Sequence, residues 1–256
     1  MDLSAAIASV LRLGFGFWDV ALIVGVSLQT TLLAFVRSPR LKAFLYSFPV
    51  PFTIANLALG RPVGASHMVG YLNLLLFMNM VRWLHVGLRL AIVASIVASA
   101  AIYCLVGVAL NAVLPLTAPA FWAAFAAVAA TGIVLARLLP HRAEPGHRSD
   151  LPVAAKFAAV AVVISALVSL KGALGGFMTT FPMVGVVAAY EARHSLWTMV
   201  RQTPLVILSL GSMAAAMWVA QQVFAVAIPA SLAIGWAVWL AILIPVSVAR
   251  WRTEGD

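Results

Sequence analysis

Two short stretches of the chain, YSFPVPFT and TTFPMVGV, place a hydroxyl-bearing residue, phenylalanine and proline together inside apolar runs. Phe48–Pro49 and Phe181–Pro182 stand at equivalent places in them. Proline removes a helical hydrogen bond and collides with the preceding turn, which leaves a carbonyl exposed. An exposed carbonyl in an apolar surrounding is tolerated only against protein or a wet cavity. We therefore predict two helices that break at these prolines inside the protein, with the hydroxyl groups just upstream meeting part of the lost hydrogen bonding.

The segment YEARHSLWTMVR is the densest polar stretch inside the apolar runs. Glu191, His194 and Thr198 are three or four residues apart, so on one helix they would share a face. Glu191 and His194 would then be able to relay protons, because histidine titrates near neutrality. The competing interpretation is a turn at the membrane surface, in which Glu191 pairs with Arg193 or Arg201 across solvent.

Two other polar residues lie within or beside apolar runs. Lys171 precedes the segment GALGG, whose small residues allow close helix approach. A cation beside a helix N-terminus can receive an anionic headgroup or carboxylate, although snorkelling to the interface also explains a lysine there. Asn56 is an amide inside an apolar run, where it would bond a neighbouring helix or act as a neutral ligand in a pore.

Several functional classes lack their motifs in this sequence. The single cysteine, Cys104, excludes an intramolecular disulfide and a cysteine-based metal site. No glycine-rich nucleotide-binding motif is present, which excludes a self-contained ATP-driven pump. Most of the 7 acidic residues stand in the tails or the central loop, so catalysis inside the membrane has little to work with. We predict a non-enzymatic protein with no cofactor and no metal site.

Membrane-spanning helices must position these residues. The chain of 256 residues is 64% hydrophobic and 9% charged, with a mean hydropathy of +1.08. A soluble domain of this length cannot bury so much apolar surface, so the bilayer must be the solvent. The apolar runs predict an all-α polytopic protein with about nine transmembrane helices. The spans lie near residues 18–36, 43–60, 64–84, 87–112, 117–139, 152–170, 173–190, 203–223 and 226–249, and residues 3–17 either extend the first span or lie on the surface.

The basic residues test this arrangement independently. With the N-terminus outside, most of the 16 Lys and Arg residues fall on the cytoplasmic side, as the positive-inside rule requires. We therefore predict an N-out, C-in orientation. The same loop ends account for the net charge of +9, so a nucleic-acid partner is not expected. The polar stretch His141 to Asp150 is expected to be a solvated cytoplasmic loop.

The two Phe–Pro motifs divide the chain into related parts. We predict a first membrane repeat of four helices over residues 1–112, a linker helix and cytoplasmic loop over 113–150, and a second four-helix repeat over 151–256. Because the linker crosses once, the repeats enter the membrane from opposite sides, which is the inverted topology of many secondary transporters. Pro49 would lie near the cytoplasmic end of its span and Pro182 near the external end, with the two broken helices meeting at a shared polar seam.

The second half resembles the small bacterial inner-membrane GlpM family, which has four spans per chain. The matching elements are Lys171, Gly175, Gly176, Phe181, Pro182, Tyr190, Arg201 and Trp236. The resemblance implies a fused, diverged double of such a unit in the bacterial inner membrane, and it supplies topology but no substrate. The segment GGFMTTF is also similar to a Gly-Gly-Phe-Thr-Thr-Phe segment of the dual-topology fluoride channels, although proline and methionine follow it here.

These observations favour an integral inner-membrane secondary carrier of a small solute, anionic or lipid-linked, that works by alternating access between inverted repeats. A non-catalytic membrane subunit of an envelope complex and a small-anion channel are the alternatives. The expected partners are the lipid bilayer and a small molecule or ion, and a homo-oligomer is left open. The residues assigned to the pathway are Phe48, Pro49, Asn56, Lys171, Thr180, Phe181, Pro182, Tyr190, Glu191, His194 and Arg201.

Overall fold

The computed structural model describes residues 16–145, 152–169 and 171–254, and these form helices without any strand. The elements are α2 (Phe17–Phe35), α3 (Pro39–Tyr46), α4 (Val50–Leu59), α5 (Ala65–Arg82), the π-helical turn η1 (Trp83–Gly87), α6 (Ile92–Val113), α7 (Ala118–Leu138), α8 (Val153–Ser169), α9 (Lys171–Leu174), α10 (Phe177–Thr180), α11 (Met183–Glu191), α12 (Leu196–Gln222) and α13 (Ile228–Glu254).

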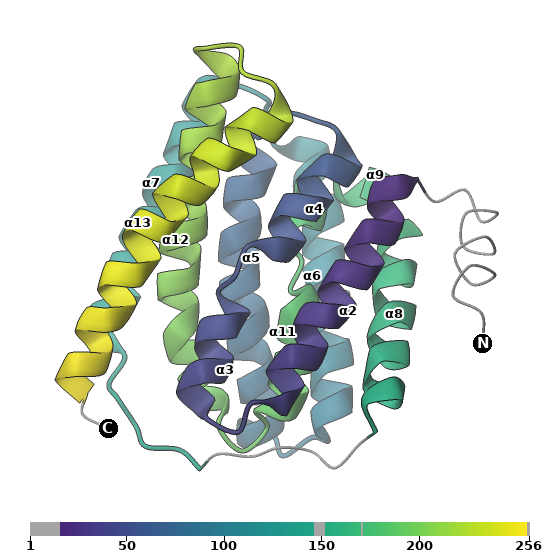
Figure 1. Ribbon diagram of the computed structural model, residues 1–256, viewed down its shortest axis with the longest axis vertical. Coiled ribbons are helices and arrows are strands. Elements are labelled where there is room, and N and C mark those ends of the chain that lie inside the picture. Colours follow the sequence, from purple (N-terminus) through teal and green to yellow (C-terminus); the bar gives the residue numbers. More distant parts are fainter. Residues whose placement is uncertain (1–15, 146–151, 170, 255–256) are drawn as a thin grey trace.

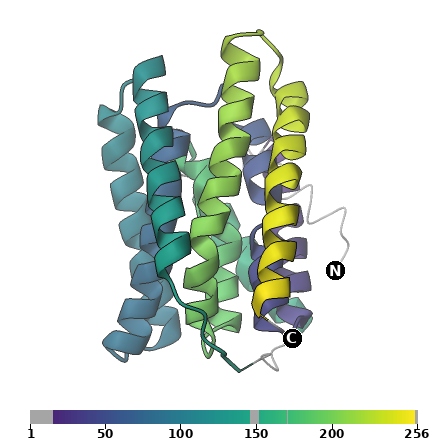
Figure 2. The ribbon, with the colours of Figure 1, turned by 90° about the vertical axis from the view of Figure 1, so that its left-hand side faces the viewer.

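The helices stand side by side in one bundle, and their connections lie at its two ends (Figures 1 and 2). In Figure 1, α2 descends, α3 and α4 together rise, α5 descends, α6 rises and α7 descends. Beyond the connector at the lower end, α8 rises, α9 to α11 descend as a broken series, α12 rises and α13 descends. We call the lower end the basic end, because the α2–α3, α5–α6, α7–α8 and α11–α12 connections and the helix ends there carry most of the described arginines.

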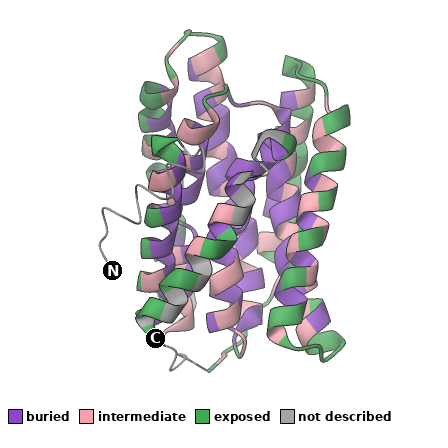
Figure 3. Cartoon of the chain, turned by 90° about the vertical axis from the view of Figure 1, so that its right-hand side faces the viewer, coloured by how far each residue is buried: buried purple, intermediate pink, exposed green. Residues whose placement is uncertain are grey.

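Five helices within the described ranges are long and apolar enough to cross a membrane, namely α2, α6, α7, α12 and the Ile228–Ala249 part of α13. Their outer faces carry large exposed apolar side chains, such as Leu105 (70% exposed) and Val113 (73% exposed). Figure 3 shows exposed residues on the outward faces and buried residues toward the middle of the bundle. Such an exterior is stable in lipid rather than water, so the helices indicate a membrane protein. The larger number of predicted spans stays a prediction, because the other elements are shorter, broken or more polar.

The helix breaks at Pro49 as predicted, but the predicted place of this break near the end of its span is wrong. The helix that leads to it begins at Pro39 rather than near residue 43, so Pro49 lies between an 8-residue and a 10-residue helix instead of near a span end. Ser38 caps α3 by accepting a hydrogen bond from the Leu41 N–H at 3.4 Å. Pro39 suits the first helical position because its φ is already helical. Pro182 likewise lies between α10 and α11 in the middle of the 171–191 series, not near its outer end.

The predicted helix face that Glu191, His194 and Thr198 would share is also wrong. Glu191 ends α11, His194 lies in the turn at residues 192–195, and Thr198 belongs to α12. Helix α12 begins at Leu196 instead of near residue 203. A distant carboxylate explains the early start: Glu144 accepts hydrogen bonds from the backbone N–H groups of the first turn of α12, which would otherwise be unsatisfied.

The helices of the two predicted repeats interleave. α5 packs against α12, and each also packs against the helix that follows it, α6 or α13. α7 packs against both α5 and α12, while α2 packs against α4, α8 and α11. The short α10 contacts α4, α5 and α6. The bundle therefore has one continuous interior, and the two broken helix pairs run through it.

Candidate functional site

Both Phe–Pro breaks line one small cavity. Its volume is about 40 Å³, and its lining includes Phe48, Pro49, Thr180, Phe181 and Pro182. The series α3–α4 and α10–α11 run in opposite directions through the bundle (Figure 1). The structure therefore brings five of the predicted pathway residues together from both halves of the chain.

At the first break, side chains donate hydrogen bonds to the backbone carbonyls. The Gln29 amide of α2 donates to the Leu45 carbonyl at 3.0 Å and to the Phe48 carbonyl at 3.4 Å. The hydroxyl of Ser47 donates to the Ala43 carbonyl at 2.9 Å. The serine was predicted to act in this way, whereas Gln29 was missed. An amide inside an apolar helix was the signal that could have found it.

The second break is supported by a tyrosine from the first half of the chain. The Tyr103 hydroxyl of α6 donates to the Phe177 carbonyl at 2.9 Å and lies 2.8 Å from Thr180 Oγ1. Thr180 Oγ1 also donates to the Phe177 carbonyl, at 3.3 Å, as the sequence predicted for a hydroxyl just upstream of the proline. Asn73 of α5 donates a hydrogen bond to the backbone carbonyl of Tyr103 at 3.0 Å and so helps to hold this tyrosine in place.

Glycines bring α10 close to its neighbours. A Cβ atom on Gly70 of α5 would collide with the side chain of Thr180, and one on Gly176 would collide with the Ser66 hydroxyl. Gly175 has φ +54°, a left-handed conformation that turns the chain between α9 and α10 and that glycine adopts readily. Small residues at these contacts let side chains of one element pack directly against the backbone of the other.

Buried polar atoms without partners accompany the cavity. Tyr71 is fully buried and lines the cavity, yet its hydroxyl has no hydrogen-bond partner within the described part of the chain. Asn56 Oδ1 and His67 Nε2, which belong to residues outside the cavity lining, also have no partner within the described residues, although the Asn56 amide nitrogen donates to the Phe52 carbonyl at 2.7 Å. The Phe52 ring lies 6.0 Å from that of Tyr71 and 6.5 Å from that of His67. Unpaired buried polar groups are rare, and each marks a place that a water or ligand would satisfy.

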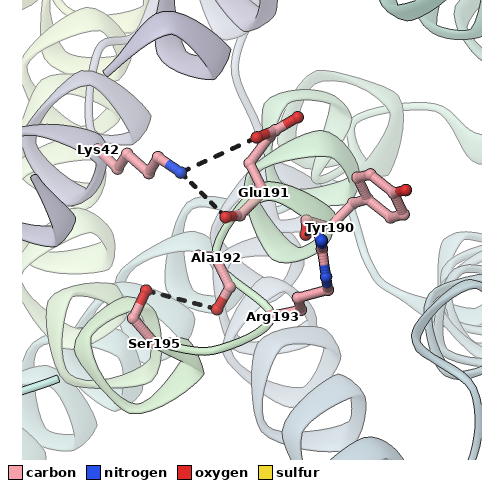
Figure 4. A network of polar contacts seen from close by, with 6 residues as sticks. All are labelled: Lys42, Tyr190, Glu191, Ala192, Arg193 and Ser195. Carbon is pink, nitrogen blue, oxygen red and sulfur yellow. Dashed lines mark hydrogen bonds and ion pairs between the residues drawn. The ribbon is translucent and has the colours of Figure 1, made fainter. Parts of the chain in front are cut away.

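A buried ion pair joins the two broken helix series (Figure 4). Lys42 Nζ lies 4.0 Å from Glu191 Oε2 and donates to the Glu191 carbonyl at 2.9 Å. Their side chains are only 1% and 0% exposed, so the predicted surface turn with a solvated Glu191 is wrong. Sequence reasoning placed Lys42 among the basic loop residues, and no local signal distinguishes it from them.

A larger cleft of about 510 Å³ lies at the basic end. α3, α12 and the connector after α7 form its walls, with a contribution from Ser247 of α13. The charged residues in its lining are Arg40, Arg142, Arg201 and Glu144. The carboxylate of Glu144 accepts hydrogen bonds from two backbone N–H groups and a hydroxyl of α12, at 3.1, 2.6 and 2.6 Å. The carboxylate is therefore engaged by the helix N-terminus, while the guanidinium groups keep the cleft basic.

The connector that forms one wall is fastened to α12. Trp197 Nε1 donates to the Pro140 carbonyl at 3.0 Å, and Arg201 Nε donates to the Leu139 carbonyl at 3.3 Å. The Arg142 guanidinium lies 4.4 Å from the centre of the Trp197 ring, a cation–π contact. The described part of the predicted loop, residues 141–145, has no helix and is mostly exposed, in agreement with the prediction, although Glu144 is bonded to α12. Residues 146–150 lie outside the described residues.

The cleft and the cavity are neighbours along α12. Leu205 lines the cleft and the next residue, Val206, lines the cavity. Gln202 also lines the cleft and donates to the Ser47 hydroxyl at 2.9 Å. A single polar contact therefore connects the cleft to the first break.

The remaining predicted residues lie apart from the cavity. Tyr190 is half-buried, with its ring 5.1 Å from the Arg193 guanidinium, and His194 is exposed. Lys171 begins α9, but its side chain lies outside the described residues. No group of three or more His, Cys, Asp or Glu side chains within the described ranges is arranged to hold a metal ion.

Comparisons with protein-family models, with curated proteins and with solved structures found no match. The resemblance to the GlpM family therefore stays a prediction from the residues quoted for it.

Proposed function

We propose that the protein is a secondary carrier that moves a small solute across a membrane by alternating access between two inverted repeats. The observation that carries the proposal is the shared cavity. Two proline-broken helices, one from each half of the chain, line the same space. Broken helices that face a common site are the usual substrate-binding device of inverted-repeat carriers.

The packing pattern supports a repeat relation. On the proposed alignment α2 corresponds to α8, α5 to α12 and α6 to α13, with α7 as the linker. Two of these pairs, α2 with α8 and α5 with α12, are direct neighbours, and α7 packs against both α5 and α12. A pseudo-two-fold axis in the middle of the bundle would produce such contacts between equivalent helices.

The cleft supplies the access that a carrier needs. It lies at the basic end, next to the cavity along α12, and the Gln202–Ser47 hydrogen bond stands between the two. We propose that this geometry is the state of the carrier that receives or releases its solute at the basic end. We propose that Tyr71, His67 and Asn56, each with a buried polar atom that has no partner in the described part of the chain, line the route to the opposite end.

The proposed orientation places the basic end in the cytoplasm, which makes the chain N-out and C-in. The positive-inside rule supports this orientation, because most of the described arginines lie in the connections and helix ends there. The bacterial inner membrane is the proposed location. Coupling to an ion gradient is proposed because the sequence has no nucleotide-binding motif.

The test begins with thermal stabilisation of the purified protein by candidate metabolites, since binding to the folded state raises apparent stability. The compounds that stabilise are then followed as radiolabelled solutes into proteoliposomes. We expect saturable uptake that depends on an ion gradient. Pro182→Ala should reduce this uptake at unchanged expression. Alanine has the backbone N–H that proline lacks, so a helical hydrogen bond to the exposed carbonyl can form and the second break is lost.

Pro245→Ala is the matched control. This proline lies inside α13 and is exposed, away from the cavity. Uptake should be the same as in the wild type. Flux that does not saturate would indicate a channel, and the absence of flux together with fixed co-purifying partners would indicate a membrane subunit. Either result would contradict the carrier.

A further inference from the structure

We propose that the cleft at the basic end is a binding site for an organic oxyanion, a carboxylate or phosphate group on a small apolar body. The proposal rests on the proposed function in one respect, since it names the class of solute that the carrier would take. Binding to the cleft can nevertheless be measured without any transport.

The charges of the lining favour an anion. Three arginines, Arg40, Arg142 and Arg201, line the cleft together with one acidic residue, Glu144, whose carboxylate is held by the N-terminus of α12. Guanidinium groups match the geometry of carboxylate and phosphate oxygens and remain charged at every relevant pH. Arg201 bonds the Leu139 carbonyl and Arg142 stacks on the indole of α12, and these contacts hold both side chains in place.

An unpartnered hydroxyl points independently to a ligand. Ser247 of α13 lines the cleft and is only 5% exposed, yet its hydroxyl has no hydrogen-bond partner within the described residues. Most serines inside helices of this chain donate to a carbonyl one turn earlier, as Ser212 does to the Leu208 carbonyl at 2.9 Å. A buried hydroxyl without a partner is costly, and we propose that Ser247 turns its hydroxyl toward an oxyanion bound in the cleft.

The rest of the wall is apolar. Leu41 and Phe44 of α3 and Leu205 of α12 line the same space as the arginines. Burial of apolar ligand surface against such side chains is favourable at about 25 cal/mol per Å². An inorganic anion would leave this wall unused, whereas a carboxylate or phosphate carried on a small apolar body would fill both parts of the cleft.

A free solute fits the position of the cleft better than a lipid headgroup. The cleft lies between α3, α12 and the fastened connector, and Leu205 in its lining is followed by Val206 in the lining of the cavity. A lipid anchored in the bilayer needs an oxyanion site that opens toward the acyl chains. The experiment distinguishes the two sources by the lipid composition around the protein.

Binding is measured by calorimetry on the full chain in nanodiscs of phosphatidylcholine. The probes are phenyl phosphate and benzoate, with benzyl alcohol as the uncharged counterpart and inorganic phosphate as the counterpart without an apolar body. We expect saturable binding of both organic anions, weaker binding of inorganic phosphate and no binding of benzyl alcohol. Equal binding of benzyl alcohol, or equal affinity for inorganic phosphate, would overturn the proposal.

The variants locate the site. Arg40→Gln should weaken binding of phenyl phosphate about tenfold, which is the loss expected for one charge-assisted hydrogen bond. Arg40→Lys should recover part of the lost affinity for phenyl phosphate. Ser247→Ala should weaken binding about fivefold without lowering the melting temperature of the free protein, because it removes a hydroxyl that has no partner there. A purely structural serine would show the opposite pattern.

Matched controls lie outside the cleft. Arg61, exposed in the α4–α5 connection at the opposite end, is changed to Gln, and Ser212 of α12 is changed to Ala. Neither should alter the affinity. Affinities that are equal in the Arg40, Ser247 and control variants would overturn the site. Loss of phenyl phosphate binding when phosphatidylglycerol replaces phosphatidylcholine would overturn the free solute in favour of a lipid headgroup.

The carrier proposal and the anion-site proposal can fail independently of each other. Organic anions that bind in an arginine-dependent way, in a protein that moves no solute, would contradict the carrier and keep the site. Saturable uptake of an uncharged solute at an unchanged rate in Arg40→Gln would keep the carrier and contradict the site.

Discussion

The two Phe–Pro breaks share a sequence motif but differ in how the protein supports them. The first break, between α3 and α4, lies next to a cleft and is supported by amide side chains, those of Gln29 and Gln202. The second, between α10 and α11, is packed against α5 through Gly70 and bonded by Tyr103. The first break therefore relies on flexible polar side chains, and the second on tight packing.

This difference assigns different work to the two sides of the cavity. A break that flexible amides support can rearrange by exchanging hydrogen-bond partners, including exchange with a ligand from the cleft. A break whose side chains are packed tightly against a neighbouring helix resists rearrangement, because close-packed interiors transmit strain. In the proposed carrier, the first break is the moving element and the second is the frame against which it moves.

The largest effect is expected where the two broken series are joined. Lys42→Met leaves the Glu191 carboxylate buried without its cation, which should lower the free energy of unfolding by about 3–5 kcal/mol. Unfolding in detergent micelles, followed by circular dichroism, measures the change. The double variant Lys42→Met, Glu191→Leu should regain most of the loss, because it removes both buried charges. Equal stability of the single and double variants would show that the pair does not join the series.

A smaller effect should separate the packed break from the adaptable one. Gly70→Ala forces a methyl group into Thr180 and should lower the free energy of unfolding by roughly 1–3 kcal/mol, as overpacking does. The matched change is Gly25→Ala in α2, where the Cβ would lie 2.7 Å from the terminal methyl of Ile54, a flexible atom that can move. Its cost should be clearly smaller in the same unfolding measurement. Equal costs would remove the distinction between the two breaks.

The smallest effect concerns single hydrogen bonds. Tyr103→Phe removes the hydroxyl from the Phe177 carbonyl and should cost about 1 kcal/mol, since Thr180 still donates there. Gln29→Leu should cost less, because the Gln29 carbonyl oxygen is itself without a partner within the described residues. Thermal unfolding of the two variants side by side provides the comparison. A greater loss for Gln29→Leu would reverse the assignment of frame and moving element.

Local signals explain what the sequence could predict. Apolar runs and the two Phe–Pro motifs predicted an all-helical chain and the breaks themselves, because proline acts on its own helix turn. The start of α3 was also local, in the Ser38–Pro39 capping signal, but it was overlooked. The repeated Phe–Pro motif was the reason to expect that the two breaks lie close together. Both breaks line the same cavity.

Long-range pairs explain what the sequence could not predict. Lys42 bonds a residue 149 positions away, and Glu144 caps a helix that begins more than 50 residues later. A lysine beside two arginines resembles any cytoplasmic connector until the fold turns it inward. The helix start at Leu196 depends on that distant carboxylate, so the polar stretch after Glu191 was assigned to one helix although the chain turns within it.

Access to the cavity from both membrane faces tests the central proposal most directly. In a Cys104→Ala background, which has no other cysteine, Val206→Cys places a single thiol in the cavity lining. A membrane-impermeant maleimide is applied to inside-out and right-side-out vesicles, with Leu105→Cys on the exposed outer face as the control. The proposal predicts that the cavity thiol reacts from both sides and the control from neither. A cavity thiol that is labelled from one side only, or from neither, would contradict alternating access.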